Sequence, residues 1–81
     1  MIYKIFRQKI GEKAKIVLQT SESHKALREV TEIFHHYEKL GKKINGDLFI
    51  KVEGRHPGKY SIIKNGIENS QEAFRFVKDC F

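Results

Sequence analysis

The sequence has few of the features that produce disulfides, membrane spans or disordered stretches. Its 81 residues include one cysteine, one proline and six glycines. A lone cysteine forms no internal disulfide, and Cys80 is more typical of a small buried hydrophobe. No apolar run approaches the roughly 18 residues of a membrane span, and the N-terminus does not resemble a signal peptide. We therefore expect one intracellular, cytoplasmic domain covering residues 1–81, with no membrane partner.

Signatures of catalytic and metal sites are also missing. No kinase, hydrolase, Rossmann or EF-hand motif is present, and no residue pattern resembles a known family. One cysteine and four histidines do not supply the paired ligand spacings of a zinc site. A ribonuclease-like site would need His24 or His56 to converge on a phosphate with a second group, and nothing in the sequence brings them together. We expect no enzymatic activity, no metal and no cofactor.

What the sequence does contain is clear periodicity. Imperfect apolar–polar alternation predicts strands at 2–9, 14–20, 47–53 and 59–64. Apolar residues three and four positions apart predict a helix over 21–40, with Gly41 after it as a C-cap. Asn69 and Glu72 match a capping box before a short C-terminal helix. The order predicts an α+β fold, ββαββα, with a four-stranded, mainly antiparallel sheet and both helices on one face.

The two halves of the chain resemble each other. Without gaps, residues 1–34 align with 48–81 at an offset of 47, and roughly two identities would be expected by chance. Eight pairs are identical: Lys4/Lys51, Gly11/Gly58, Ile16/Ile63, Ser23/Ser70, Ala26/Ala73, Arg28/Arg75, Val30/Val77 and Phe34/Phe81. Similarity at a fixed spacing is typical of a duplicated supersecondary unit. A single hairpin is marginal alone, whereas two ββα units share one core.

The net charge of +6 is unevenly distributed. The two predicted helices together carry −1, so the strands and loops carry +7. If both helices cover one face of the sheet, the positive surface is the other, open face together with its hairpin tips. A basic balance indicates partners rather than fold, with nucleic acid or an acidic protein as the candidates.

Strand alternation predicts which side chains lie on that open face. We expect Ile5, Ile16 and Leu18 to point toward the helices, and Lys15 and Val17 away from them. The faces of the fourth strand are ambiguous. The predicted nucleic-acid-binding residues, on the open face and at the hairpin tip of 54–58, are Lys4, Phe6, Lys15, Phe49, Lys51, Arg55, Lys59 and Tyr60.

Lysines interleaved with aromatic rings suit a single-stranded nucleic acid, because phosphates meet the cations and bases stack on the rings. Our first hypothesis is a non-enzymatic module that binds nucleic acid, RNA more readily than duplex DNA. The alternative is a small regulator or inhibitor, comparable in composition to phage or plasmid effectors, that binds an acidic protein such as a nucleic-acid enzyme. A homodimer through the open face is compatible with both, since exposed apolar residues there would form a patch for a partner.

Overall fold

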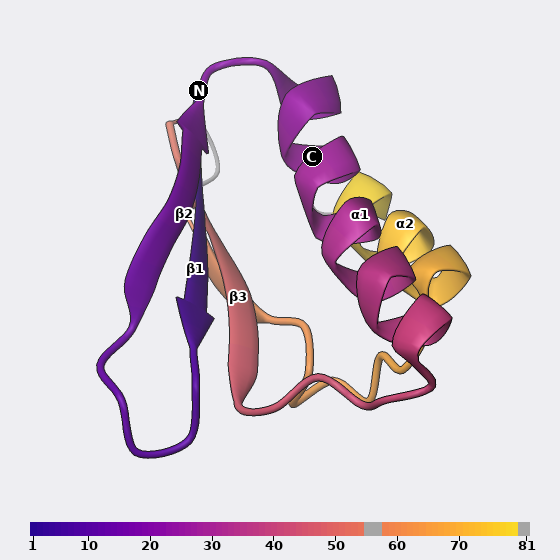
Figure 1. Cartoon of the computed structure of the whole chain (residues 1–81). Coiled ribbons are helices and arrows are strands. Elements are labelled where there is room, and N and C mark those ends of the chain that lie inside the picture. Colours follow the sequence, from indigo (N-terminus) through magenta and orange to yellow (C-terminus); the bar gives the residue numbers. More distant parts are fainter. Residues whose placement is uncertain (55–57, 80–81) are drawn as a thin grey trace.

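A computed structural model of the chain describes residues 1–54 and 58–79. Its elements are β1 (Ile2–Gln8), β2 (Lys15–Thr20), α1 (Ser23–Leu40), β3 (Asp47–Glu53), β4 (Gly58–Ser61) and α2 (Ser70–Asp79). The four strands form one antiparallel sheet in the order β2-β1-β3-β4 (Figure 1). The predicted α+β fold and its ββαββα order are confirmed. Within the described ranges, no helix combines the length and apolar character needed to cross a bilayer.

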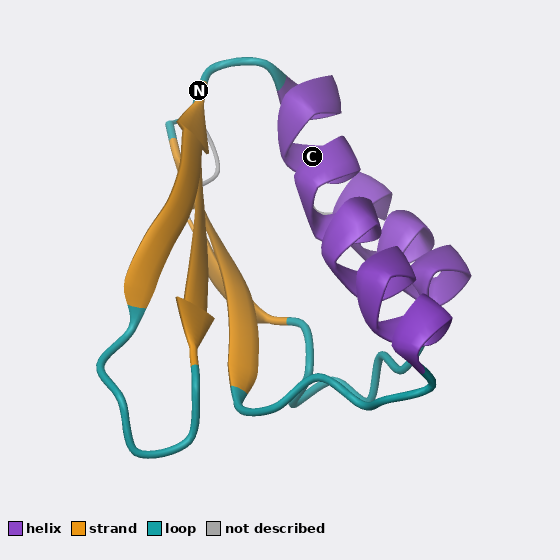
Figure 2. Cartoon of the chain, viewed as in Figure 1, coloured by secondary structure: helices purple, strands orange, loops and turns teal. Residues whose placement is uncertain are grey.

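Both helices lie on the same side of the sheet, and none of the described residues forms a helix on the other side (Figure 2). The core between the two layers is apolar. From the sheet it takes Tyr3, Ile5, Leu48, Ile50 and Val52; from the helices it takes Ala26, Val30, Phe34, Ala73 and Val77. Burying these side chains supplies the main favourable term for folding a chain of this size.

The helix ends follow the predicted signals in part. Gly41 adopts the left-handed conformation after α1, and the NH groups of Gly41 and Lys42 bond to carbonyls of the last turn. At α2, the Asn69 side chain accepts a hydrogen bond from the NH of Glu72 at 2.8 Å. The N-cap position of α1 is Glu22, and its side chain makes no capping hydrogen bond.

A β-bulge in β2 overturns the predicted faces at the start of this strand. Ile5 pairs with Leu18 but Phe6 pairs with Ile16, so Val17 is the extra residue. One inserted residue exchanges the faces of every residue beyond it. Ile16 therefore lies on the open face, whereas Lys15 pairs with Arg7 on the helix side.

The spacing between the two halves is kept by some elements and not by others. α1 and α2 begin at Ser23 and Ser70, which are equivalent at the offset of 47. Lys4 and Lys51, also equivalent, are direct partners across β1 and β3. The outer strands β2 and β4 depart from this spacing. An offset of 47 would place the equivalent of β2 at residues 62–67, but β4 ends before them, at Ser61. The duplication itself stays a prediction.

Candidate nucleic-acid interface

Three lysines lie side by side across the open face of the sheet. Lys4 on β1 is the cross-strand partner of Lys51 on β3, and Lys51 is the partner of Lys59 on β4. Gln19 on β2 continues the row beyond Lys4. We call Lys4, Lys51 and Lys59 the lysine row. Like charges placed directly opposite each other destabilise a sheet, so an arrangement of this kind calls for a negatively charged counterpart.

The chain supplies part of that counterpart through Glu53. Its Oε1 atom lies 2.9 Å from Nζ of Lys4 and 3.5 Å from Nζ of Lys51. The hydrogen bond from Lys4 is the main reason why the pKa of Glu53 lies below its usual value. Glu53 is thus ionised at neutral pH and offsets one of the three positive charges, which leaves the row with two.

An apolar row lies next to the lysine row on the same face. Ile16, Phe6 and Phe49 are neighbours across β2, β1 and β3. The rings of Phe6 and Phe49 stack with centroids 5.1 Å apart and planes 16° from parallel. Nζ of Lys59 lies 4.3 Å from the centroid of Phe49, a cation–π contact that ties the two rows together.

Phe49 lies on the open face as predicted, but it is covered. Only 6% of the residue is exposed, because the Phe6 ring and the Lys59 side chain lie against it. Phe49 therefore presents little surface on which a base could stack. Phe6, which remains half-buried, and the exposed Ile16 are the apolar side chains that a base would reach.

Two other predicted residues lie on the helix side. Tyr60 is the partner of Ile50 and packs against the core, so alternation carries its neighbours Lys59 and Ser61, not Tyr60, onto the open face. Lys15 lies on the helix side because of the bulge. Arg55 lies outside the described residues. The open face thus brings together five of the eight predicted residues: Lys4, Phe6, Phe49, Lys51 and Lys59.

Sequence reasoning missed two members of this surface, Glu53 and Ile16. Glu53 was detectable, because it lies two residues after Lys51 and alternation places both on one face. Ile16 was not detectable, since its exposure of 48% depends on the bulge; Val17, which was expected to face away from the helices, is 43% exposed. Both lie on the free edge strand β2, where a partner chain would find unpaired backbone groups.

The histidines make only peripheral contacts. Nε2 of His24 lies 3.8 Å from a Glu22 carboxylate oxygen, and Nδ1 of His35 lies 3.5 Å from one of Glu38. Among residues 1–54 and 58–79, no group of three or more His, Cys, Asp or Glu side chains is placed to hold a metal ion. His56 lies outside these ranges.

Comparison with family models, curated proteins and solved structures finds no significant match to this chain. Its function is therefore inferred from the chemistry of its own surfaces.

Proposed function

We propose that this protein is a non-enzymatic binding module that holds a single-stranded nucleic acid, RNA more readily than duplex DNA, across its open sheet face. The observation that carries the proposal is the lysine row lying beside the Ile16, Phe6 and Phe49 row on the face without helices. Strands are about 4.8 Å apart, so the lysine row spans about 10 Å between its first and last strands.

The geometry supports a single strand because both of its chemical components find a counterpart. Phosphates contact the ammonium groups, while unpaired bases lie on the adjacent apolar side chains. A duplex offers phosphates but not the second match, since its bases are stacked inside and its major groove admits a helix or a two-stranded ribbon rather than a broad sheet. The hairpin tips, including Lys9 and Lys13 of the β1–β2 loop, add positive charge around the face.

Fluorescence-anisotropy titrations test the proposal with labelled single-stranded RNA, single-stranded DNA and duplex DNA at 50 and 200 mM salt. A net row charge of two predicts a salt slope of about −1.4, which weakens single-strand binding about sevenfold over this range. Lys51→Glu is expected to abolish binding. Lys39→Glu, an equal charge change on the exposed end of α1, is the matched control. Binding that ignores salt, or no binding at 50 mM, would contradict the proposal.

A second candidate function is favoured by the exposed Ile16 and Val17 on edge strand β2. An acidic protein partner, or a second copy of the chain, would cover these side chains while its charge meets the lysine row. A stoichiometric complex that survives nuclease treatment would support this candidate. Sedimentation showing only monomer at high concentration would count against a homodimer.

A further inference from the structure

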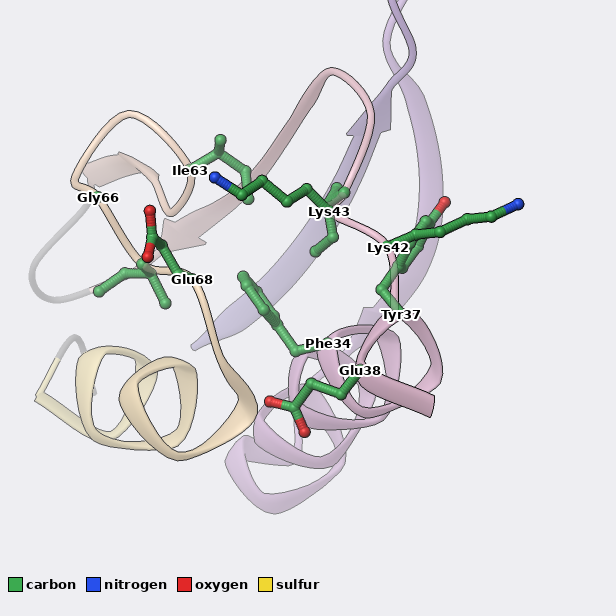
Figure 3. A pocket seen from close by; sticks show the side chains of 10 residues that line it. Phe34, Tyr37, Glu38, Lys42, Lys43, Ile63, Gly66 and Glu68 are labelled. Atoms are coloured by element: carbon green, nitrogen blue, oxygen red, sulfur yellow. The ribbon is translucent and has the colours of Figure 1, made fainter. Parts of the chain in front are cut away.

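A cavity of about 270 Å³ lies at the end of α1, between the segment after this helix and the loop that joins β4 to α2 (Figure 3). Four apolar residues line it: Phe34, Ile44, Ile63 and Ile67. Charged side chains stand around them, with Lys42, Lys43, Glu38 and Glu68 among the lining residues. Sites for drug-sized ligands begin at about 300 Å³, so this cavity suits a single ring rather than an extended molecule.

Unpaired charges of both signs lie at this cavity. Glu38 already has a structural task, because its carboxylate accepts hydrogen bonds from the backbone NH and the hydroxyl of Ser70 at the start of α2. By contrast, the side chains of Lys43 and Glu68 make no hydrogen bond or ion pair with any described residue, although both line the cavity. In Figure 3, Lys43 extends over the side of the cavity near Ile63, and Glu68 lies on that same side.

An occupant that fits here needs three properties. Its body must be apolar enough to lie against the isoleucines, it must present a hydrogen-bond donor to Glu68, and it must present an acceptor or an anion to Lys43. A nucleobase with an exocyclic amino group has all three, because ring acceptors and a phosphate accompany its amino donor. Uracil has no amino group; its one free donor, the ring N3–H, lies between two carbonyl oxygens that the Glu68 carboxylate would repel, so it is the poorer match.

The cavity also adjoins a second cavity that reaches the edge of the open face. This second, more open cavity of about 280 Å³ lies at the adjoining end of the sheet, and Ile63 lines both cavities. Gln8 and Asp47 line the second cavity together with Lys9 and Lys64. Gln8 and Asp47 are cross-strand partners, and strand alternation places them on the same face of the sheet as Phe6 and Phe49. Two lysines therefore line the second cavity, which lies between the open face and the cavity that contains Lys43.

We infer that the cavity between the end of α1 and the β4–α2 loop binds one unpaired, amino-bearing base of a single strand that crosses the open face. The amino group donates to the Glu68 carboxylate, and Lys43 contacts the phosphate or a ring acceptor. This inference rests on the proposed function and deepens it, because the lysine row supplies affinity and the cavity supplies base preference.

Oligonucleotide titrations and chemical-shift mapping test the inference on the full chain. Single-stranded oligo-C and oligo-U of about eight nucleotides are titrated into wild type, Glu68→Gln and the control Glu32→Gln, which removes an exposed carboxylate on α1. Wild type and the control are expected to prefer oligo-C by at least about fivefold. Glu68→Gln is expected to reduce the preference to less than about twofold. Added CMP should shift the amide signals of residues 43, 63 and 66–68 rather than those of 4, 51 and 59.

The Lys51→Glu variant separates the two ideas. If it loses binding while wild type binds oligo-C and oligo-U equally, the cavity inference is overturned and the proposed function stands. A preference for oligo-C that persists in Glu68→Gln also overturns the inference. If Lys51→Glu binds as wild type does, the proposed function and the inference that rests on it both fail.

Discussion

Glu53 is the residue whose replacement tests the proposed interface most directly. Its carboxylate contacts the ammonium groups of both Lys4 and Lys51, and a phosphate entering the row competes with it for those groups. In Glu53→Gln the side chain keeps its shape and loses its charge. A mutation in an interface usually weakens binding, whereas here removal of an internal competitor is expected to strengthen it.

The size of the effect follows from the charge of the row. Three lysines and one glutamate leave a net charge of two in the wild type, and the variant raises this to three. Each neutralised phosphate on a single strand adds about −0.7 to the slope of log K against log salt. The slope is therefore expected to change from about −1.4 to about −2.1, and the fall in affinity between 50 and 200 mM salt from about sevenfold to about 18-fold.

Anisotropy titrations with labelled single-stranded RNA at 50, 100 and 200 mM salt measure both slopes. Glu32→Gln makes the same change in net charge on α1, where the glutamate lies 4.0 Å from Arg28 and pairs with no other described residue, and it should leave the slope near −1.4. If Glu53→Gln binds no more tightly at 50 mM and keeps the wild-type slope, the lysine row is not the binding site. Equal effects of the two variants would point to net charge alone and refute the reasoning in the same way.

Two further predictions concern stability. Gly46 has a φ of +91°, and a Cβ at this position would lie 1.9 Å from the carbonyl oxygen of Gln8. Gly46→Ala should therefore lower the free energy of unfolding, measured by chemical denaturation, by at least about 2 kcal/mol. An unchanged denaturation midpoint would contradict the close approach. The hydrogen bonds from Ser70 lower the pKa of Glu38 below its usual 4.5, so the stability they provide is present above pH 4.5 and is lost as the pH falls through the lowered value. Glu38→Gln should be less stable than wild type at pH 7 and approach it below pH 4.5; a difference that stays constant with pH would exclude this role.

The fold was predictable where the sequence has a strong period. The long helix was readable because its apolar residues keep spacings of three and four up to Gly41, and β1 and β3 alternate clearly enough to place Ile5 and Ile50 in the core. In β2 the run Ile16, Val17, Leu18 is apolar at every position, so alternation could not reveal the bulge. The faces of its first residues depend on pairing with β1, which is a tertiary property.

The residues of the candidate site were predictable where they lie in strands with clear alternation. Lys4 and Lys51 were placed correctly because they lie in the two strands with clear alternation. Tyr60 was not, because β4 is only four residues long and either face suited its sequence. The burial of Phe49 was beyond alternation altogether, since it comes from the ring of Phe6 on the neighbouring strand and from Lys59.

The repulsion between the three lysines of the open face is compensated only weakly within the protein. Cross-strand repulsion between like charges disfavours the row in the isolated protein, and the internal compensation consists of Glu53 and the contact of Lys59 with Phe49. Both are surface interactions of modest strength that a polyanion can replace. Because Glu53 holds Lys4 and Lys51 only weakly, the open face is stable without a partner, and its lysines remain accessible to a phosphate. Its affinity should accordingly depend more on salt than on base identity, and any base preference has to come from a separate site such as the cavity at the end of α1.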